Sequence, residues 1–311
     1  MKRSALALPA NPYPQPSAVL ELLKPVTWAP PMWAFACGVV SSGASLSQSW
    51  PFLLVGVILA GPLLCAMSQA MNDWFDRHVD ALNQPERPIP SGRVPGNWGL
   101  YIAIAWAGVS LLVASALGPW VFGATMIGIA LAWAYSAPPL RLKNNGWLGN
   151  AAVGFSYEGL AWFTGAAAVL GVFPDWRIVM LEVLYSLGAH GIMTLNDFKA
   201  IAGDAKMGVR TLPVQLGAPR AARVACWVMA LPQVAVILLL VSWGRPVFAA
   251  AVFALLLAQF VVMRRYLLDH ERLMREPVKS AALYNAWGVS FYILGMMISA
   301  FAMRGLVVAG I

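Results

Sequence analysis

The sequence predicts an all-α, polytopic membrane protein, and three observations support this fold class. Hydrophobic residues make up 60% of the 311 residues, and the mean hydropathy is +0.69. Nine apolar runs are each near the roughly 20 residues that cross a hydrocarbon core. A polar motif that follows one of these runs recurs once, which indicates two similar halves. We therefore expect nine transmembrane helices, built as a parallel internal repeat around one cavity.

The nine predicted spans follow one another with short connections. They lie near residues 30–48, 51–71, 97–117, 119–136, 149–170, 176–196, 222–242, 246–263 and 282–304. The first residues imitate a signal peptide, but the apolar part is too short and a Pro-rich polar stretch follows. We expect residues 1–29 to be an uncleaved, disordered cytoplasmic leader that ends in an interfacial segment, and residues 30–311 to form a single transmembrane domain.

The basic residues predict the orientation of the chain. The formal charge is +8, but the basic residues are dispersed over short loops, so nucleic acid is not an expected partner. With nine spans and the N-terminus inside, only Arg177, Arg245 and Arg304 of the 21 Lys and Arg fall on the outer face. The positive-inside rule then places the N-terminus in the cytoplasm and the C-terminus on the opposite side.

Residues 72–93 read NDWFDRHVDALNQPERPIPSGR and concentrate charge directly after an apolar run. Asn72, Asp76 and Asp80 recur every four residues and Asp73 stands three before Asp76, so all four share one broad face if the preceding helix continues. Three acids on one face repel each other unless a cation lies between them. Oxygen ligands without paired His or Cys favour Mg²⁺ over Zn²⁺. Since Mg²⁺ is usually bound by one or two carboxylates plus substrate phosphates, the predicted ligand is a metal-bound phosphate or diphosphate.

Residues 196–217, NDFKAIAGDAKMGVRTLPVQLG, repeat this pattern at an offset of 124 residues from Asn72 to Asn196. Asp197 and Asp204 are seven residues apart, which two helical turns would bring to one face, although two glycines weaken that expectation. Both motifs follow spans that run in the same direction. They are therefore expected to face each other across one cavity at the cytoplasmic side.

Several basic residues near the motifs are candidates to neutralise an anionic ligand. For any single cytoplasmic Lys or Arg, topology alone is a sufficient explanation. Prolines after residue 84 nevertheless hold Arg87 near the acidic helix end, where a guanidinium can bind diphosphate in a bidentate manner. A membrane anchor is the simpler interpretation of Lys24. The candidates are Lys24, Arg87, Arg141, Lys143, Lys206 and Arg210.

Two carboxylates and one histidine fall within predicted spans. Glu158 would lie about 13 Å along its helix, and because intramembrane acids usually face a cavity or a polar partner, we expect it to line the cavity. Glu182 is nearer the outer end of its span and is expected at the interface. His190 lies seven residues before Asp197, on nearly the same helix face and two turns deeper. It is either a hydrogen-bonded packing residue or a substrate contact, and the sequence leaves both open.

The predicted site combines two acidic clusters that hold Mg²⁺, cations around them, and a helical bundle beneath. This combination suits a substrate with a diphosphate head and a long hydrocarbon tail. An isoprenyl diphosphate has this form. The chain resembles the UbiA-type intramembrane prenyltransferases at these positions. NDWFDRHVDALNQPERPIPSGR resembles the first motif of their chlorophyll synthase branch, and residues 135–162 and 196–217 are similar to the same branch. The resemblance covers nearly the whole membrane region.

The resemblance implies esterification of the propionate of a bacteriochlorophyllide with geranylgeranyl or phytyl diphosphate, in a bacterial inner, photosynthetic membrane. It implies Mg²⁺ as the cofactor, surrounding membrane lipid, and partner proteins of pigment biosynthesis or photosystem assembly. The implied metal ligands are Asn72, Asp73, Asp76, Asp80, Asp197 and Asp204. The implied catalytic residues are Asp73, Asp76, Arg87, Arg141 and Lys143. The implied substrate contacts are Lys24, Glu158, His190, Lys206 and Arg210.

Two positions depart from the pattern of many UbiA-type relatives. Their second acidic pair is four residues apart, which would put the first acid at Ala200, whereas Asp197 fills this place here as in the chlorophyll synthase branch. A basic residue is also expected after Asp204, where this chain has Ala205. Lys206 is the candidate to replace that contact.

Two other functions stay open. Another UbiA-type transferase would prenylate an aromatic ring or haem instead of a pigment carboxylate. A secondary transporter also has internal repeats and intramembrane acids, but transporter sites usually lie near the bilayer midplane. Because both acidic motifs lie at one face, the sequence favours an enzyme.

Overall fold

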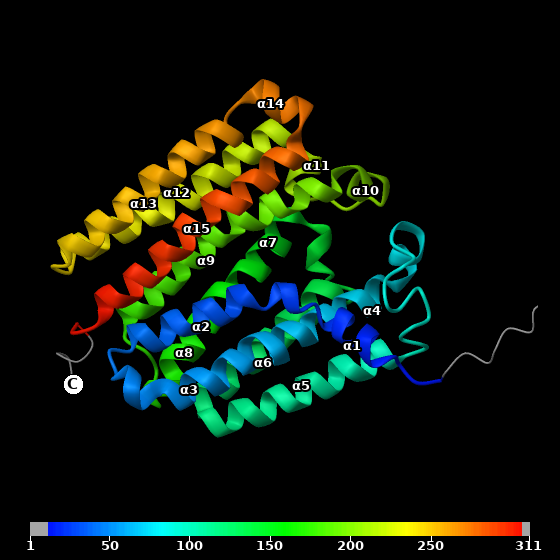
Figure 1. The fold of residues 1–311 in the computed structure, drawn as a ribbon, viewed down its shortest axis with the longest axis horizontal. Coiled ribbons are helices and arrows are strands. Elements are labelled where there is room, and N and C mark those ends of the chain that lie inside the picture. The colour runs from blue at the N-terminus through cyan, green and yellow to red at the C-terminus, as the bar shows by residue number, and fades with distance from the viewer. Residues whose placement is uncertain (1–11, 307–311) are drawn as a thin grey trace, which may run out of the picture.

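The computed structural model describes residues 12–306, which form a helical bundle that contains no strand (Figure 1). Helices of the first part of the chain fill the lower half of the view, and α9, α12, α13 and α15 fill the upper half. Helices α7 and α8 connect the halves, since α8 packs on α2 and α7 packs on α9. The predicted all-α class is confirmed.

Seven helices are long and apolar enough to cross a membrane within the described part of the chain. Two of the predicted spans, 119–136 and 176–196, coincide with α6 and α9. The seven are Leu46–Asn83, Trp98–Leu117 (α5), Pro119–Ser136 (α6), Trp176–Lys206, Ala218–Ser242 (α12), Pro246–Tyr266 (α13) and Pro277–Met303 (α15). α9 is the part Trp176–Asn196 of the fourth of these.

The two remaining predicted spans are helical but fall outside this set of seven. The first is α2, Ala29–Ser41, with only 13 residues. The second consists of α7 (Gly146–Gly154), the π-helical segment η4 (Phe155–Leu160) and α8 (Ala161–Leu170). The count of nine spans and the internal repeat therefore stay predictions.

The helix that carries the first acidic motif contains a π-helical segment. It runs as α3 (Leu46–Ile58), η2 (Leu59–Cys65) and α4 (Ala66–Asn83). Pro62 lies inside η2, where its missing N–H removes one helical hydrogen bond. The Trp106 indole donates to the Pro62 carbonyl oxygen at 3.0 Å. This contact ties the irregular segment to α5.

The N-terminal segment differs from the expected leader. Pro16–Leu23 forms α1, which packs on α4 and buries Ala18, Leu22 and Leu23. The expectation of disorder is therefore wrong for this part, because three apolar side chains on one side of the segment find a packing surface. Residues 1–11 of the expected leader lie outside the described residues, and the domain boundary at residue 29 stays a prediction.

Short helices occupy the connections between the long ones. Figure 1 shows α1, α10 and α11 near the right-hand end of the bundle, where α4 also ends, and the end of α15 at the left. The short elements are η1 (Pro25–Thr27), η3 (Leu142–Asn144), η5 (Asp197–Ala200), α10 (Ile201–Lys206), α11 (Leu212–Leu216) and α14 (His270–Arg275).

Candidate active site

The first acidic motif lies on the last turns of α4. The helix continues to Asn83, which meets the condition for a shared face, and it ends before the proline-rich loop. Asn72, Asp73, Asp76 and Asp80 are therefore all helical, and Asp73 and Asp80 are buried. Unpaired charges at such positions would destabilise the fold, so each carboxylate needs a partner.

Lys24 and Arg87 provide partners for the two buried carboxylates. Lys24 Nζ lies 2.6 Å from Asp73 Oδ1, and Arg87 Nη1 lies 2.8 Å from Asp80 Oδ2 and 3.4 Å from Asp73 Oδ1. Lys24 has a left-handed backbone conformation at the end of α1, which turns the chain as it enters η1. Lys24 thus contacts the acidic motif directly, and it is not only a membrane anchor.

Arg141 and Lys143 bind the other side of the motif. Arg141 Nη2 lies 2.8 Å from Asp76 Oδ1, and Lys143 Nζ lies 2.5 Å from Asp76 Oδ2 and 3.0 Å from Asn72 Oδ1. Burial lowers the pKa of Lys143, although the nearby Asp76 carboxylate acts in the opposite direction. Four cations from three separate segments therefore surround about two turns of α4.

The second motif is less regular than its spacing suggests. α9 ends at Asn196, residues 197–200 form the 3₁₀ segment η5, and α10 follows. Asp197 and Asp204 therefore do not lie on one continuous α-helix, which corrects the expectation of two regular turns. Asn150 Nδ2 donates to Asp197 Oδ2 at 3.3 Å, and Thr211 Oγ1 donates to Asp204 Oδ2 at 3.4 Å.

The two motifs lie close together, as their parallel arrangement predicts. Asn83, at the end of α4, donates to the Met207 sulfur at 3.3 Å. The connection before α7, residues 137–145, contacts the first motif through the side chains of Arg141 and Lys143. Its backbone contacts the second motif, because Arg210 N donates to Asn144 O at 3.0 Å and Gly146 N donates to Arg210 O at 2.8 Å. A side chain at Gly146 would overlap the backbone of Leu212, so this approach requires glycine.

Two residues at this junction were not predicted as site residues. Asn150 lies on α7 and bonds both Asp197 and Thr194. Tyr135, at the end of α6, lies within electrostatic range of Asp76 of the first motif and of Asp197 and Asp204 of the second. A polar residue early in an apolar span, and a tyrosine at the end of one, are the signals that could have identified them.

The predicted metal ligands do not form one cluster in the part of the chain that the structure describes, and two of the predicted cations form no ion pair there. Within residues 12–306, no three His, Cys, Asp or Glu side chains lie close enough to hold a metal ion, since the acids of the first motif alternate with cations. The side chains of Lys206 and Arg210 form no ion pair with a described residue, although the Arg210 backbone is fixed.

Glu158, Glu182 and His190 have different surroundings in the bundle. Glu158 is half-buried on η4, and no described residue forms an ion pair with it. Glu182 is buried, with Oε2 unpaired, so its side chain faces the inside of the bundle, and its interfacial depth stays a prediction. His190 is also buried, and its Nε2 lies 3.2 Å from the Trp147 carbonyl oxygen.

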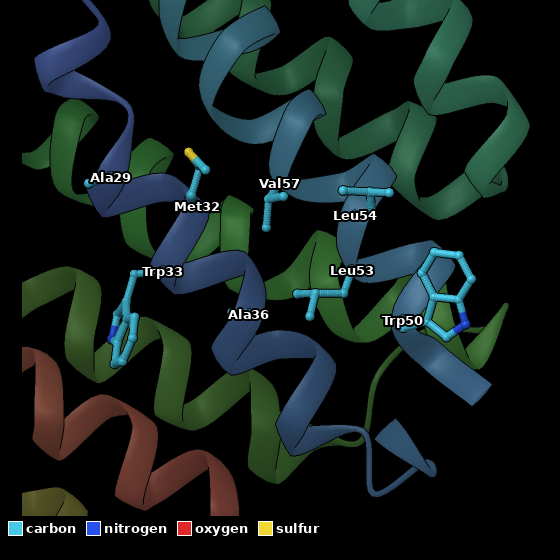
Figure 2. A pocket seen from close by; sticks show the side chains of 8 residues that line it. All are labelled: Ala29, Met32, Trp33, Ala36, Trp50, Leu53, Leu54 and Val57. Atoms are coloured by element: carbon cyan, nitrogen blue, oxygen red, sulfur yellow. The ribbon is translucent and has the colours of Figure 1, made fainter. Parts of the chain in front are cut away.

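An apolar groove opens between α2 and α3, with a volume of about 600 Å³ (Figure 2). Its lining begins at Ala29, shortly after Lys24, and suits a hydrocarbon chain. The lining residues are Ala29, Met32, Trp33, Ala36, Trp50, Leu53, Leu54 and Val57.

The fold and this end of the bundle define a helical membrane protein in which two acidic motifs and four of their predicted cations meet at one end. The chain belongs to the UbiA prenyltransferase family, whose model matches residues 28–283.

Relatives of known description cover almost the whole chain. The bacteriochlorophyll synthase 33 kDa chain of Cereibacter sphaeroides is 54% identical over 301 residues, which is 97% of each chain. The chloroplastic chlorophyll synthase of Oryza sativa subsp. japonica is 38% identical, over 91% of this chain and 76% of that one. A solved UbiA homolog from Archaeoglobus fulgidus bound to GPP and Mg²⁺ has a similar fold, with a TM-score of 0.67, 22% identity, and coverage of 90% of this chain and 99% of that one.

Proposed function

We propose that this protein transfers a geranylgeranyl or phytyl group from its diphosphate to the propionate of bacteriochlorophyllide a. The observation that carries this proposal is the 54% identity to a bacteriochlorophyll synthase chain over nearly the full length. The resemblance in both acidic motifs and in residues 135–162 agrees with it. The reaction forms the ester bond and releases diphosphate.

The proposed catalytic groups act on the charge that develops as the allylic C–O bond breaks. Four cations contact the first motif by forming ion pairs with Asp73, Asp76 and Asp80. They are Lys24, Arg87, Arg141 and Lys143. Cations already held in place stabilise the departing diphosphate without a large reorganisation. Lys206 and Arg210 are proposed to contact the same anion from the second motif.

The donor set suits Mg²⁺, because it consists of carboxylate and amide oxygens. Asp73 Oδ2 is buried without a hydrogen-bond partner, so at least one oxygen is available for a further ligand. We propose that Asn72, Asp73, Asp76, Asp80, Asp197 and Asp204 hold the metal together with substrate phosphates. When bound, Mg²⁺ would act as a Lewis acid on the diphosphate oxygens.

The proposed acceptor requires no strong base. A propionate is ionised near neutral pH, as carboxylic acids in water normally are, so it can attack the allylic carbon without first losing a proton. This agrees with the composition of the site, where Asp73, Asp76 and Asp80 pair with Lys and Arg side chains. Glu158 is proposed to contact the acceptor from within the bundle.

The proposed location is a bacterial inner, photosynthetic membrane, with the acidic motifs at the cytoplasmic face. Seven long apolar helices support a membrane location. The distribution of Lys and Arg supports the orientation, which places the C-terminus on the opposite side.

The test is a direct assay with purified protein in detergent. The protein is incubated with bacteriochlorophyllide a, geranylgeranyl diphosphate and Mg²⁺, and the esterified pigment is measured with and without EDTA. We expect ester only when Mg²⁺ is present. If folded protein esterifies neither bacteriochlorophyllide nor chlorophyllide with either prenyl diphosphate, the proposal is wrong, and aromatic and haem acceptors become the next candidates.

A further inference from the structure

His190 is a buried polar residue that the diphosphate chemistry does not use. It lies on α9, seven residues before Asp197, which is about 10 Å deeper in the bundle. Only 8% of the residue is exposed. Each ring nitrogen of a histidine at this depth is expected to have a hydrogen-bond partner, and a nitrogen without one requires an explanation.

The two ring nitrogens of His190 have different surroundings. Nε2 lies 3.2 Å from the Trp147 carbonyl oxygen, and since a carbonyl oxygen only accepts, Nε2 carries the proton. Nδ1 of the neutral ring then presents a lone pair. Nδ1 is buried and has no hydrogen-bond partner among the described residues. A ligand that accepts this lone pair would remove an unfavourable feature of the fold.

The surrounding contacts fix the position of the ring relative to the second acidic motif. The imidazole packs against the Trp147 indole, with ring centroids 5.6 Å apart, and that indole is itself 45% exposed. Thr194 Oγ1 donates to the His190 carbonyl oxygen at 3.0 Å, and Asn150 Nδ2 donates to both Thr194 and Asp197. The α7–α9 contact that positions Asp197 therefore also positions His190.

This arrangement is typical of a metal-ligating histidine, whose other ring nitrogen donates to a backbone carbonyl or carboxylate. No group of three or more His, Cys, Asp or Glu side chains within residues 12–306 includes His190, so it has no partners with which to hold a free metal ion. A lone imidazole is sufficient for a metal that is already held by four nitrogens of a macrocycle and lacks an axial ligand.

We propose that His190 Nδ1 is the axial ligand of the central Mg²⁺ of the bacteriochlorophyllide acceptor, with the macrocycle entering beside Trp147. This inference rests on the proposed function. The lone pair of Nδ1 forms a coordinate bond to the metal and displaces a solvent ligand, with no change in oxidation state. The macrocycle then lies two turns below the diphosphate site, and its propionate arm extends towards Asp197 and the first motif.

The experiment measures binding, so it does not depend on turnover. Protein in detergent is titrated with bacteriochlorophyllide a and, separately, with its metal-free form, and the visible absorption band that reports metal coordination is recorded. The unmodified protein is expected to bind the Mg²⁺ pigment about tenfold more tightly or better. H190F is expected to bind the two pigments equally and to lose the coordination signal. H270F, at an exposed position on α14, is the matched control and should behave like the unmodified protein.

A second variant separates ligation from packing. In H190A, added imidazole is expected to restore tighter binding of the Mg²⁺ pigment alone. Equal binding of both pigments by the unmodified protein, a retained preference in H190F, or an equal loss for both pigments in H190F would each overturn the inference. If the unmodified protein esterifies bacteriochlorophyllide but its binding preference does not depend on His190, only this inference fails. If it esterifies no pigment, the proposed function fails instead.

Discussion

Asp76 is the point at which the connection before α7 meets the first acidic motif. Its two carboxylate oxygens pair with different side chains, Oδ1 with Arg141 and Oδ2 with Lys143. Removing its charge would leave two cations without their shared partner and would remove a proposed metal ligand. A single substitution therefore tests both the charge network and the metal site.

D76N keeps the shape of the side chain and removes its charge. We expect the esterification rate to fall by about 10²–10³-fold, because preorganised electrostatic groups contribute on that order. The rate is measured with saturating substrates and Mg²⁺, and folding is checked by thermal unfolding in detergent. E271Q, which changes an exposed carboxyl on α14 to an amide, is the control and should keep the normal rate. Near-normal turnover in D76N would contradict the proposed role.

Lys143 provides a prediction on pH dependence. Burial lowers its pKa, so it loses its proton, and with it the positive charge, at a lower pH than an ordinary lysine. If the charged form is needed, activity should decline on the alkaline side, and K143R should extend the plateau to higher pH because arginine stays protonated. The measurement is the pH profile of the esterification rate for both proteins. An unchanged alkaline limb in an active K143R would show that Lys143 does not set it.

Helices α2 and α8 pack so closely that their backbones touch. A Cβ added at Gly165 would lie 2.1 Å from the Phe35 carbonyl oxygen, and one at Gly38 would lie 2.0 Å from the Trp162 carbonyl oxygen. Small residues of this kind allow membrane helices to approach each other. The contact also positions Trp162, which is buried and stacks on Tyr185 of α9. The α2–α8 pair therefore supports the helix that carries the second motif.

G165A should lower the free energy of unfolding by about 1–3 kcal/mol, because backbone atoms cannot move aside for the new methyl group. The midpoint of thermal unfolding in detergent measures this effect. Gly123 on α6 has no heavy atom within 4 Å of an added Cβ, so G123A is the matched control. It should be neutral or stabilising by up to about 1 kcal/mol, since alanine favours helix over glycine. Equal midpoints for the two variants would contradict the close packing.

The assembled chain places both acidic motifs at one end of the bundle and the end of α15 at the other (Figure 1). The Lys and Arg residues follow the same division, with only Arg177, Arg245 and Arg304 expected on the outer face. Substrate diphosphate and Mg²⁺ would therefore enter from the cytoplasm, while the pigment and prenyl chain enter from the membrane.

Fusions to the C-terminus test this orientation. Alkaline phosphatase, which is active only outside the cytoplasm, should be active in such a fusion, whereas green fluorescent protein should stay dark there. The reverse result would place the C-terminus inside and would contradict the proposed topology. Fusions after residue 269, in the connection before α14, are the control and should give the opposite pair of signals.

The sequence by itself determined the features that depend on local pattern. Apolar runs of sufficient length predicted α6 and α9 with the observed bounds, since hydropathy is a property of consecutive residues. The four-residue spacing of Asn72, Asp76 and Asp80 likewise predicted a shared face on condition that the helix continues, and α4 meets this condition because it runs to Asn83. The proximity of the two motifs followed from their parallel placement in the chain.

Only the tertiary structure decided which distant groups meet. Lys24 pairs with Asp73 across 49 residues, and Asn150 bonds Asp197 across 47. The helix break at residue 197 and the burial of Glu182 also have no local signal. These features depend on how helices pack against each other, and a packing partner far along the chain leaves no period or composition in the segment itself. Local sequence determined the helices, and packing determined the site.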